Sequence, residues 1–350
     1  MNTIGNSFRI SIFGESHGAY VGCTLDGLPA GFMPDWDLIH FDLSRRMPNK
    51  RTHSTERHET DDFEIISGLY NDAFTGAPLT VLFKNRDLQS EFYLERIARP
   101  SHADYTAYVK YGGYNDPRGG GMFSGRLTAP IVFAGSIARQ ILLKQDIRIF
   151  SHIYRIGSIS DEPFDPLLTM ETLPYLDMKF PLVDENKKSE IEKLFSDAKQ
   201  RGTSLGGTVE CSVLGLPIGI GEPFFDSVES QLSHMLFSIP AVHGVEFGAG
   251  FGFAEMDGVT ANDRVLSGGK TETNFSGGVN GGITNGMSLI FRTCFRPVPT
   301  VRAEQTTINI ETDTEVSFRG NERHDVCILP RGCVIVECAA AIALLDLLMR

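Results

Sequence analysis

Three side chains capable of acid–base or hydrogen-bonding chemistry stand next to one another near the start of the chain. Glu15, Ser16 and His17 follow a short strand pattern that ends at Gly14, and Gly18 comes directly after them. A serine and a histidine could form a nucleophile and its base, but adjacent residues rarely reach each other productively. A better use is that Ser16 and His17 donate separately to one anion, together with backbone N–H groups of the turn. An ordinary strand-to-loop turn is the alternative.

A basic segment, 45–58, stands out in an acidic protein. It holds five lysines and arginines against one glutamate, whereas the whole chain carries a net charge of −12. Clustered positive charge focuses the local field and favours a multiply charged anionic ligand. A solvated charged loop is the alternative.

Two further glycine-rich, polar stretches carry residues of the same kind. The stretch 99–126 contains His102, and its glycines lead into Arg126 at the start of a long apolar segment. Backbone N–H groups at a helix start and an arginine fork suit a phosphate or the edge of a flavin ring. The stretch 319–337 contains Arg-His-Asp at 323–325, ahead of a second apolar segment. Together, the polar stretches point to a phosphorylated substrate.

Standard cofactor and metal motifs are incomplete in this chain. The segment 264–271 ends like a phosphate-binding loop, but Arg264 stands where the first glycine is needed. The segment 248–253 begins like a dinucleotide fingerprint, but Phe253 occupies the position of its last glycine. The two histidines of the basic segment are five residues apart, which is poor spacing for sharing a metal on one helix face.

The composition indicates a large folded protein. The chain has 350 residues, of which 41% are hydrophobic and 22% are charged, close to the globular norm. The acidic balance argues against a general nucleic-acid binder. No apolar run reaches the ~18 residues of a membrane span, and the first residues lack the pattern of a signal peptide. We therefore expect a cytoplasmic protein.

The cysteines are expected to be reduced and mostly buried, because free cysteine is usually a core residue. None of them forms a Cys-x-x-Cys pair, and they lack the spacing of a zinc site. The six are Cys23, Cys211, Cys294, Cys327, Cys333 and Cys338.

Apolar periodicity predicts the elements that must position the polar stretches. We expect helices over 35–47, 125–145, 188–202, 226–239 and 332–349, and strands over 78–85, 207–217 and 287–295. The mixture lacks a regular βαβ alternation, which argues against a doubly wound parallel sheet. No linker composition divides the chain, so a single domain over residues 1–350 is expected.

Three long stretches resemble the three signature regions of the chorismate synthase family, in the same order and at matching spacing. They are 13–31, 119–139 and 323–339, and the segments 99–106, 206–226, 238–251 and 274–286 are also similar to that family. The resemblance covers nearly the whole chain. It implies an α+β fold, a single large β-α-β sandwich, that assembles as a homotetramer.

The resemblance also implies a reaction. The family is a group of carbon–oxygen lyases acting on phosphates, in the shikimate pathway of aromatic amino acid biosynthesis. They convert 5-enolpyruvylshikimate 3-phosphate to chorismate and phosphate by an anti-1,4-elimination. The family requires reduced FMN, although the reaction has no net redox change. Some members reduce their own FMN with NADPH, and the sequence leaves that question open here.

The resemblance assigns roles to the polar residues. His17 would donate a proton near the departing phosphate, with Ser16 beside it. His102 would lie near the N1 and C2 carbonyl region of the flavin, and Asp325 would lie near N5, in the relay that removes a proton from the substrate ring. Glu15 is expected to be structural. The substrate would be bound by Ser16, Arg45, Arg46, Arg51, Arg126 and Arg323.

Cofactor contacts are implied at a second set of positions, and two stretches there depart from the family pattern. Many members have Arg-Ser in place of Met122-Phe123 and glutamate in place of Leu127, and many have Lys-Pro-Thr-Ser-Ser where this chain has Arg-Pro-Val-Pro-Thr. The flavin phosphate is therefore expected to use different partners here. The implied positions are Met122, Phe123, Ser124, Pro240, Ala241, Gly281, Arg296, Pro297, Val298, Pro299, Thr300 and Arg323.

Two other functions fit parts of the pattern. One is a non-catalytic protein that binds a phosphate ligand or RNA through the basic segment; its binding would survive loss of both histidines, and flavin would be irrelevant to it. The other is a different flavin-dependent lyase on the same scaffold.

Overall fold

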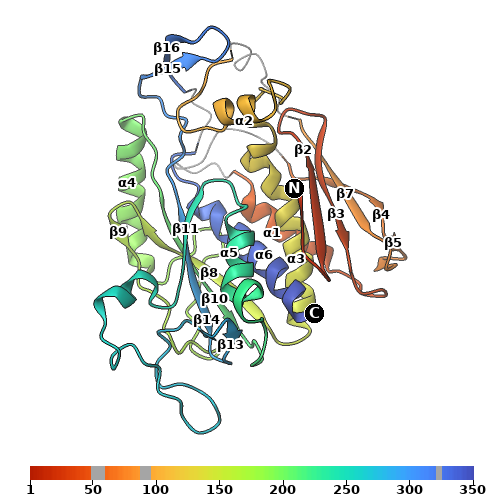
Figure 1. Ribbon diagram of the computed structural model, residues 1–350, viewed down its shortest axis with the longest axis vertical. Helices are drawn as coiled ribbons and strands as arrows, with labels where there is room; N and C mark the ends of the chain where they lie inside the picture. The colour runs from red at the N-terminus through yellow and green to blue at the C-terminus, as the bar shows by residue number, and fades with distance from the viewer. Residues whose placement is uncertain (49–59, 87–95, 321–324) are drawn as a thin grey trace.

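Two antiparallel sheets enclose a layer of helices (Figure 1). The computed structural model describes residues 1–48, 60–86, 96–320 and 325–350. The first sheet has the order β1-β2-β3-β7-β4, with the strands Thr3–Ile4, Arg9–Gly14, Tyr20–Asp26, Leu79–Lys84 and Phe63–Ser67. The second has the order β11-β14-β10-β8-β9, with the strands Val242–Phe247, Leu289–Phe295, Gly207–Leu214, Arg148–Ile156 and Ile159–Ser160.

The helical layer consists of α1, α3, α5 and α6, which span Trp36–Arg46, Thr128–Leu143, Val228–Leu236 and Leu329–Leu348. The long helices α3 and α6 are buried on almost every side, as their apolar composition predicts. They approach so closely at Gly135 that a Cβ atom there would lie 2.2 Å from the Cβ atom of Cys338. The expected α+β fold, a β-α-β sandwich, is confirmed.

The predicted elements are all present, with boundaries shifted by a few residues. Helix α1 begins after Asp35, whose carboxylate accepts hydrogen bonds from the N–H groups of Asp37 and Leu38. Helix α4, Lys188–Gln200, ends ahead of Gly202, which has a positive φ of 66°. Its Leu194 lies near the β8–β9 turn, at the outer edge of the second sheet.

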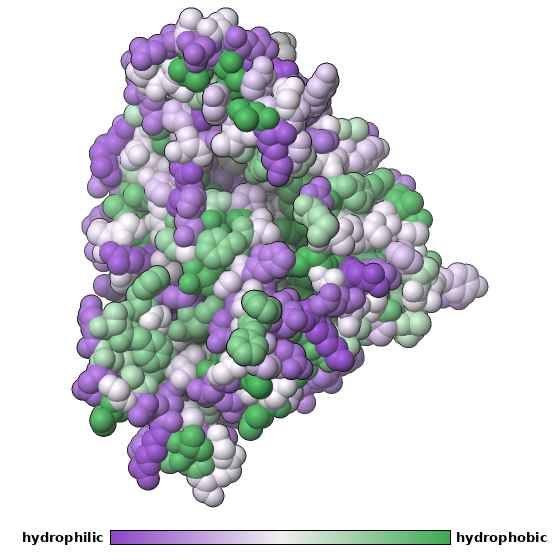
Figure 2. All heavy atoms as spheres, viewed as in Figure 1, coloured by the Kyte–Doolittle hydropathy of each residue, from purple (hydrophilic) through white to green (hydrophobic). Residues whose placement is uncertain are grey.

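A smaller group of elements lies at one end of the sandwich. Helix α2, Asp104–Lys110, and the hairpin formed by β15 and β16, Gln305–Asn309 and Thr314–Phe318, lie at the top of Figure 1. The short helices η2, Gly121–Phe123, and η3, Gly125–Leu127, lead into α3. Figure 2 shows the surface hollowed between this upper part and the body of the molecule.

The remaining elements are short. They are the hairpin strands β5, β6, β12 and β13, at Leu69–Tyr70, Ala73–Phe74, Val279–Asn280 and Ile283–Thr284, and the 3-10 helices η4, η5 and η6, at Glu185–Lys187, Phe224–Asp226 and Gly250–Glu255.

The cysteines and the apolar helices behave largely as expected. All six cysteines are free thiols; five are buried and Cys294 is exposed. Burial raises the pKa of the Cys327 thiol to about 12, so this thiol stays protonated at neutral pH.

Within the described ranges, no helix combines the length and the apolar character needed to cross a membrane.

Candidate active site

A cavity of about 1150 Å³ opens where the upper elements meet the ends of the sandwich. Most of the residues expected at the site line it, although they come from widely separated parts of the chain. They are Ser16, His17, Arg46, His102, Met122, Phe123, Ser124, Arg126, Pro240, Ala241, Arg296, Val298, Pro299 and Asp325. Thr300 lies beside the cavity, in contact with His102. Arg51, Arg323 and most of the basic segment lie outside the described residues.

The opening motif forms a tight turn at the end of β2, and its polar side chains are buried against the cavity. The N–H of Gly18 donates to the carbonyl oxygen of Glu15 at 3.0 Å, which closes the turn around Ser16 and His17. Within the described structure, the buried hydroxyl of Ser16 has no hydrogen-bond partner. A buried hydroxyl without a partner costs free energy, so a ligand oxygen that reaches it would be favoured.

The glycine-rich stretch packs directly onto this turn. The N–H of Ser16 donates to the carbonyl oxygen of Gly121 at 3.1 Å. Gly119 has a φ of 62°, and a Cβ atom there would lie 2.5 Å from the ring of His17 and 2.8 Å from the hydroxyl of Ser16. Only glycine fits at this position, because both the backbone conformation and the available space exclude a side chain.

Two arginines share one buried carboxylate beside the turn. Arg46 donates to both oxygens of Asp61, at 2.7 and 2.6 Å, and Arg126 donates to Asp61 at 2.5 Å. The three groups together carry one net positive charge, and the shared carboxylate orients both guanidiniums. Sequence reasoning found the two arginines but missed Asp61, which has no motif around it.

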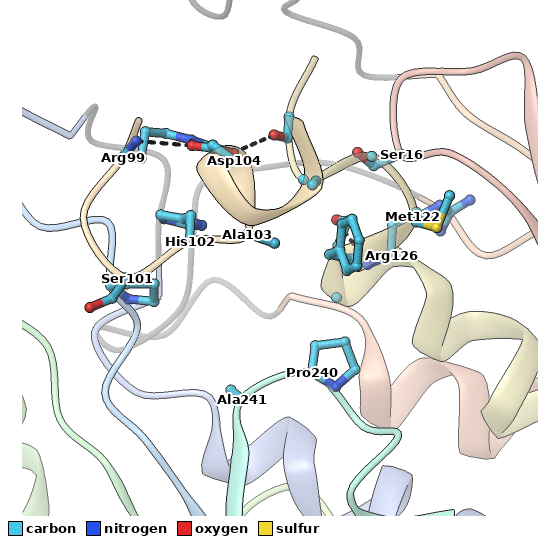
Figure 3. Close-up of a pocket in the computed structure, with 18 of the residues that line it drawn as sticks. Ser16, Arg99, Ser101, His102, Ala103, Asp104, Met122, Arg126, Pro240 and Ala241 are labelled. Atoms are coloured by element: carbon cyan, nitrogen blue, oxygen red, sulfur yellow. Dashed lines mark hydrogen bonds and ion pairs between the residues drawn. The ribbon is translucent and has the colours of Figure 1, made fainter. Parts of the chain in front are cut away.

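His102 contacts a residue 198 positions further along the chain. The ring nitrogen Nε2 of His102 lies 2.7 Å from the hydroxyl oxygen of Thr300. The preceding Arg99 forms a two-point ion pair with Asp104, at 2.7 and 2.6 Å, and donates to the carbonyl oxygen of Gly119 at 2.5 Å. Arg99 therefore joins the His102 segment to Gly119, which packs against His17. Figure 3 shows Arg99 beside Asp104 and His102.

The opposite wall of the cavity contains a strained backbone position. Ala241 has a φ of 74°, a conformation that residues other than glycine seldom adopt. Its carbonyl oxygen accepts a hydrogen bond from the N–H of Arg296 at 2.9 Å, and the Arg296 guanidinium donates to Ser101 at 3.0 Å. Figure 3 shows Pro240 and Ala241 across the cavity from the loop that carries His102.

Asp325 is paired at the start of α6. Arg331 donates to its carboxylate at 2.6 Å and also to the carbonyl oxygen of Arg46 at 2.6 Å. Arg323 and His324, which precede Asp325 in the sequence, lie outside the described residues. Arg331 was missed, although it lies in the same signature region as Asp325.

The rim of the cavity combines aromatic and charged side chains. Tyr108, Tyr111 and Tyr114 line one side of it. On the neighbouring loop, Arg118 donates to both oxygens of Asp116, at 2.9 and 2.8 Å, and these hydrogen bonds lower the pKa of Asp116. The aromatic faces offer apolar contact area to a planar ligand.

Besides Thr300, three expected site residues in the described part of the chain do not line the cavity. Gly281 is exposed on the β12–β13 hairpin and does not line the cavity. Pro297 does not line it either, although its neighbours do. Arg45, expected to bind substrate, is buried between α1 and α6, where it forms a two-point ion pair with Glu337 at 2.6 and 2.8 Å.

The contacts of Arg45 explain why it is separated from the cavity. Asp42 and Arg139 complete the cluster, with Arg139 3.1 Å from Glu337 and 2.9 Å from Asp42. Burial alone would raise the pKa of Glu337, but the charges of Arg45 and Arg139 outweigh burial and lower it. The cluster is therefore a structural ion network inside the helical layer, and the position of Arg45 corrects the expectation that it faces the substrate.

Replacing Arg45 by methionine is expected to lower the free energy of unfolding by about 3–5 kcal/mol, because it removes the two-point partner of a buried carboxylate. The matched control is Arg9→Met, at the exposed ion pair with Asp26, where about 0–1 kcal/mol is expected. Urea denaturation measures both. An Arg45→Met protein with unchanged stability and a raised KM would contradict the structural role and indicate that Arg45 binds the substrate.

Comparisons with known proteins agree with this geometry. A sequence model of the family described as chorismate synthase matches residues 8–349. A chorismate synthase of Chitinophaga pinensis is 44% identical over 352 residues, which cover 100% of this chain and 97% of that protein. A chorismate synthase of Thermococcus gammatolerans is 43% identical, over 99% of this chain and 97% of that protein.

A solved structure described as a crystal structure of chorismate synthase superposes with a TM-score of 0.76 at 25% identity. The superposition covers 99% of this chain and 92% of that one. The match of fold therefore extends over the same range as the match of sequence. Because both comparisons span nearly the whole chain, and the cavity gathers most of the signature residues, the chain belongs to the chorismate synthase family of lyases.

Proposed function

We propose that the protein eliminates phosphate from 5-enolpyruvylshikimate 3-phosphate to give chorismate, with reduced FMN bound in the same cavity. The observation that carries this proposal is the meeting of the Ser16–His17 turn with the Arg46–Asp61–Arg126 cluster at one cavity. Hydroxyl, imidazole and guanidinium donors converge there, and a phosphate ester is the ligand that such a set suits best.

The donors favour departure of the phosphate. A phosphate that leaves a carbon gains negative charge on its bridging oxygen, so donors placed near it bind the transition state more strongly than the ground state. We assign proton donation to His17 and hydrogen bonding to Ser16, whose hydroxyl is buried and has no partner within the described structure. Arg46 and Arg126 supply the positive charge.

The second half of the elimination removes a hydrogen from the substrate ring. We assign Asp325 to the acceptance of that proton, because it is the carboxylate that lines the cavity at the start of α6. The hydrogen bond from Arg331 holds the carboxylate in position beside the cavity.

The cavity residues fit a flavin. A cavity of about 1150 Å³ exceeds the usual volume of a site for one small ligand, so it accommodates a cofactor together with the substrate. Pro240 and Ala241 line the cavity on one side, and the tyrosines offer aromatic faces to a flavin ring. His102 offers a ring nitrogen, whose position is fixed by its contact with Thr300. When bound, reduced FMN supplies the electron density that assists cleavage of the carbon–oxygen bond without net redox change.

The flavin phosphate requires other partners than in many family members. Met122 and Phe123 line the cavity but offer no charged donor. We assign the role to Arg296, whose guanidinium lines the cavity next to Ser101. The planar guanidinium suits two-point binding of phosphate.

His102→Ala is expected to lower kcat by roughly 10- to 10⁴-fold and to weaken binding of reduced FMN, because an imidazole near the flavin carbonyl region favours its anionic form. Anaerobic titration by flavin fluorescence measures the affinity, with His234→Ala on the exposed side of α5 as control. Unchanged FMN affinity and unchanged kcat would remove His102 from the site.

The decisive assay is anaerobic incubation with photoreduced FMN and 5-enolpyruvylshikimate 3-phosphate, followed through chorismate absorbance. We expect chorismate with reduced FMN and none with oxidised FMN. A third sample with oxidised FMN and NADPH shows whether the protein reduces its own cofactor. Substrate binding without product in any sample would instead favour the non-catalytic phosphate binder.

We also propose that the chain forms a single domain over residues 1–350 that acts as a cytoplasmic homotetramer, without nucleic-acid or membrane partners. Phe224, Phe225 and Phe251 are 85%, 89% and 86% exposed, and large exposed aromatic side chains are typical of surfaces that bind another chain. Light scattering coupled to size exclusion tests the assembly; a monomer at micromolar concentration would contradict it.

A further inference from the structure

One buried amide connects the Ser16–His17 turn with Arg126. Asn85 follows the last residue of β7, is 5% exposed and does not line the cavity. We propose that Asn85 is a positioning residue of the elimination, which sets the distance and orientation between the turn and the guanidinium. The inference rests on the proposed roles of Ser16, His17 and Arg126.

The NH₂ group of Asn85 closes the turn. Its Nδ2 atom donates to the carbonyl oxygens of Glu15 and Gly18, at 3.0 and 2.8 Å. These two carbonyls lie on either side of Ser16 and His17 in the chain. The backbone N–H of Asn85 also donates to the carbonyl oxygen of Ala19 at 3.1 Å, which continues the β3–β7 ladder past its last pair. The sheet therefore holds the backbone of Asn85 in place, and the side chain of Asn85 holds the Ser16–His17 turn in place.

The carbonyl oxygen of the same amide holds the arginine. Oδ1 of Asn85 accepts a hydrogen bond from Nε of Arg126 at 2.9 Å. The neighbouring Lys84 accepts a second one through its backbone oxygen at 3.3 Å, and Asp61 accepts a third. A guanidinium can only donate and a backbone carbonyl can only accept, so the orientation of the Asn85 amide is settled by its partners.

A single substitution separates the two contacts. Asn85→Asp keeps the size of the side chain and the acceptor toward Arg126, but it has no donor for the two carbonyls of the turn. The added negative charge of the aspartate is expected to weaken binding of the anionic substrate and so to raise KM. The loss of the two contacts to the turn displaces Ser16 and His17, and this effect is measured as a lower kcat at saturating substrate. We expect kcat to fall about 100-fold, the effect of displacing a catalytic group by about 1 Å.

The chain offers a matched control at a site away from the cavity. Asn274 is also buried, donates to the carbonyl oxygens of Pro166 and Ser288 at 3.0 and 2.9 Å, and accepts from the N–H of Gly278 at 2.8 Å. Asn274→Asp therefore removes the same number of donors from the same kind of setting. We expect it to lower Tm to a similar extent and to leave kcat within about 3-fold of wild type, since no reacting group depends on it.

A second variant keeps the test informative should Asn85→Asp not fold. Asn85→Gln retains every donor and acceptor on a side chain that is longer by one methylene, and we expect kcat to fall about 10-fold from the resulting displacement. A His17→Ala protein is assayed in parallel. If His17→Ala is impaired while every Asn85 variant that folds keeps kcat within 3-fold of wild type, the role of Asn85 is overturned.

The other outcomes are equally distinct. If kcat falls as far in Asn274→Asp as in Asn85→Asp, Asn85 has a merely structural role and the inference fails. If His17→Ala keeps the wild-type kcat, the proposed role of His17 fails first, whatever the Asn85 variants do. A fall in kcat that is specific to Asn85, with Tm values matched to the Asn274 control, supports the assignment.

Discussion

Replacing His17 by alanine is expected to lower kcat by roughly 10²- to 10⁴-fold, the range found for removal of a general acid. The imidazole is buried beside the cavity, and Gly119 packs against it so closely that no side chain fits between them. The turn itself is held by backbone contacts and by Asn85, so the fold should persist. Steady-state turnover with saturating reduced FMN and substrate measures the effect.

The control for this variant is His234→Ala, at an exposed position of α5, for which turnover within about 3-fold of wild type is expected. Circular dichroism shows whether both proteins fold. A folded His17→Ala protein that keeps full kcat would remove His17 from the chemistry. A protein that loses affinity for substrate but keeps kcat would make it a binding residue only.

Replacing Asp325 by asparagine is expected to lower kcat by roughly 10²-fold or more while FMN and substrate bind nearly as well as in wild type. Asparagine keeps the size of the side chain and can still accept the hydrogen bond from Arg331, but it cannot accept a proton. A deuterium isotope effect at the ring carbon should grow as proton removal becomes more rate-limiting. Asp257→Asn, on an exposed turn, is the control.

Two results would contradict the role of Asp325. Unchanged kcat in Asp325→Asn would show that another group accepts the proton. Loss of FMN binding with no change in the isotope effect would make Asp325 a positioning residue, acting with Arg331 to hold the start of α6 against the carbonyl oxygen of Arg46.

The elements and the lining of the site were largely predictable, because both depend on local patterns. Every helix and strand predicted from apolar periodicity is present in the structure. Most of the site residues expected from the signature stretches line the cavity. The positions that departed from the family pattern, Met122 and Phe123, nevertheless line the cavity. Backbone shape rather than side-chain chemistry brings them there.

The residues that sequence reasoning missed act through contacts between distant parts of the chain. Asp61 joins Arg46 to Arg126, and Asn85 joins the turn to Arg126. These residues are far apart in the sequence, so no local sequence pattern could predict the contacts. A weak signal existed for Asn85, a polar residue at the end of the predicted strand 78–85. Its partners could be named only once the sheet order placed β7 beside β3.

The adjacent arginines Arg45 and Arg46 show a different limit. Consecutive residues of a helix point about 100° apart, and here Arg46 lines the cavity whereas Arg45 points into the helical layer. The choice between them was open to sequence reasoning, because Glu337 stands alone in the apolar interior of α6. A buried carboxylate requires a buried cationic partner, and Arg45 is that partner.

The most direct test of the account is an anaerobic single-turnover experiment, in which the enzyme with photoreduced FMN is mixed with a limiting amount of 5-enolpyruvylshikimate 3-phosphate. Phosphate release, chorismate absorbance and the flavin spectrum are recorded together. The account predicts one chorismate and one phosphate for each substrate molecule, with the flavin reduced at the end. Phosphate release without chorismate, or a stoichiometric oxidation of the flavin, would contradict it.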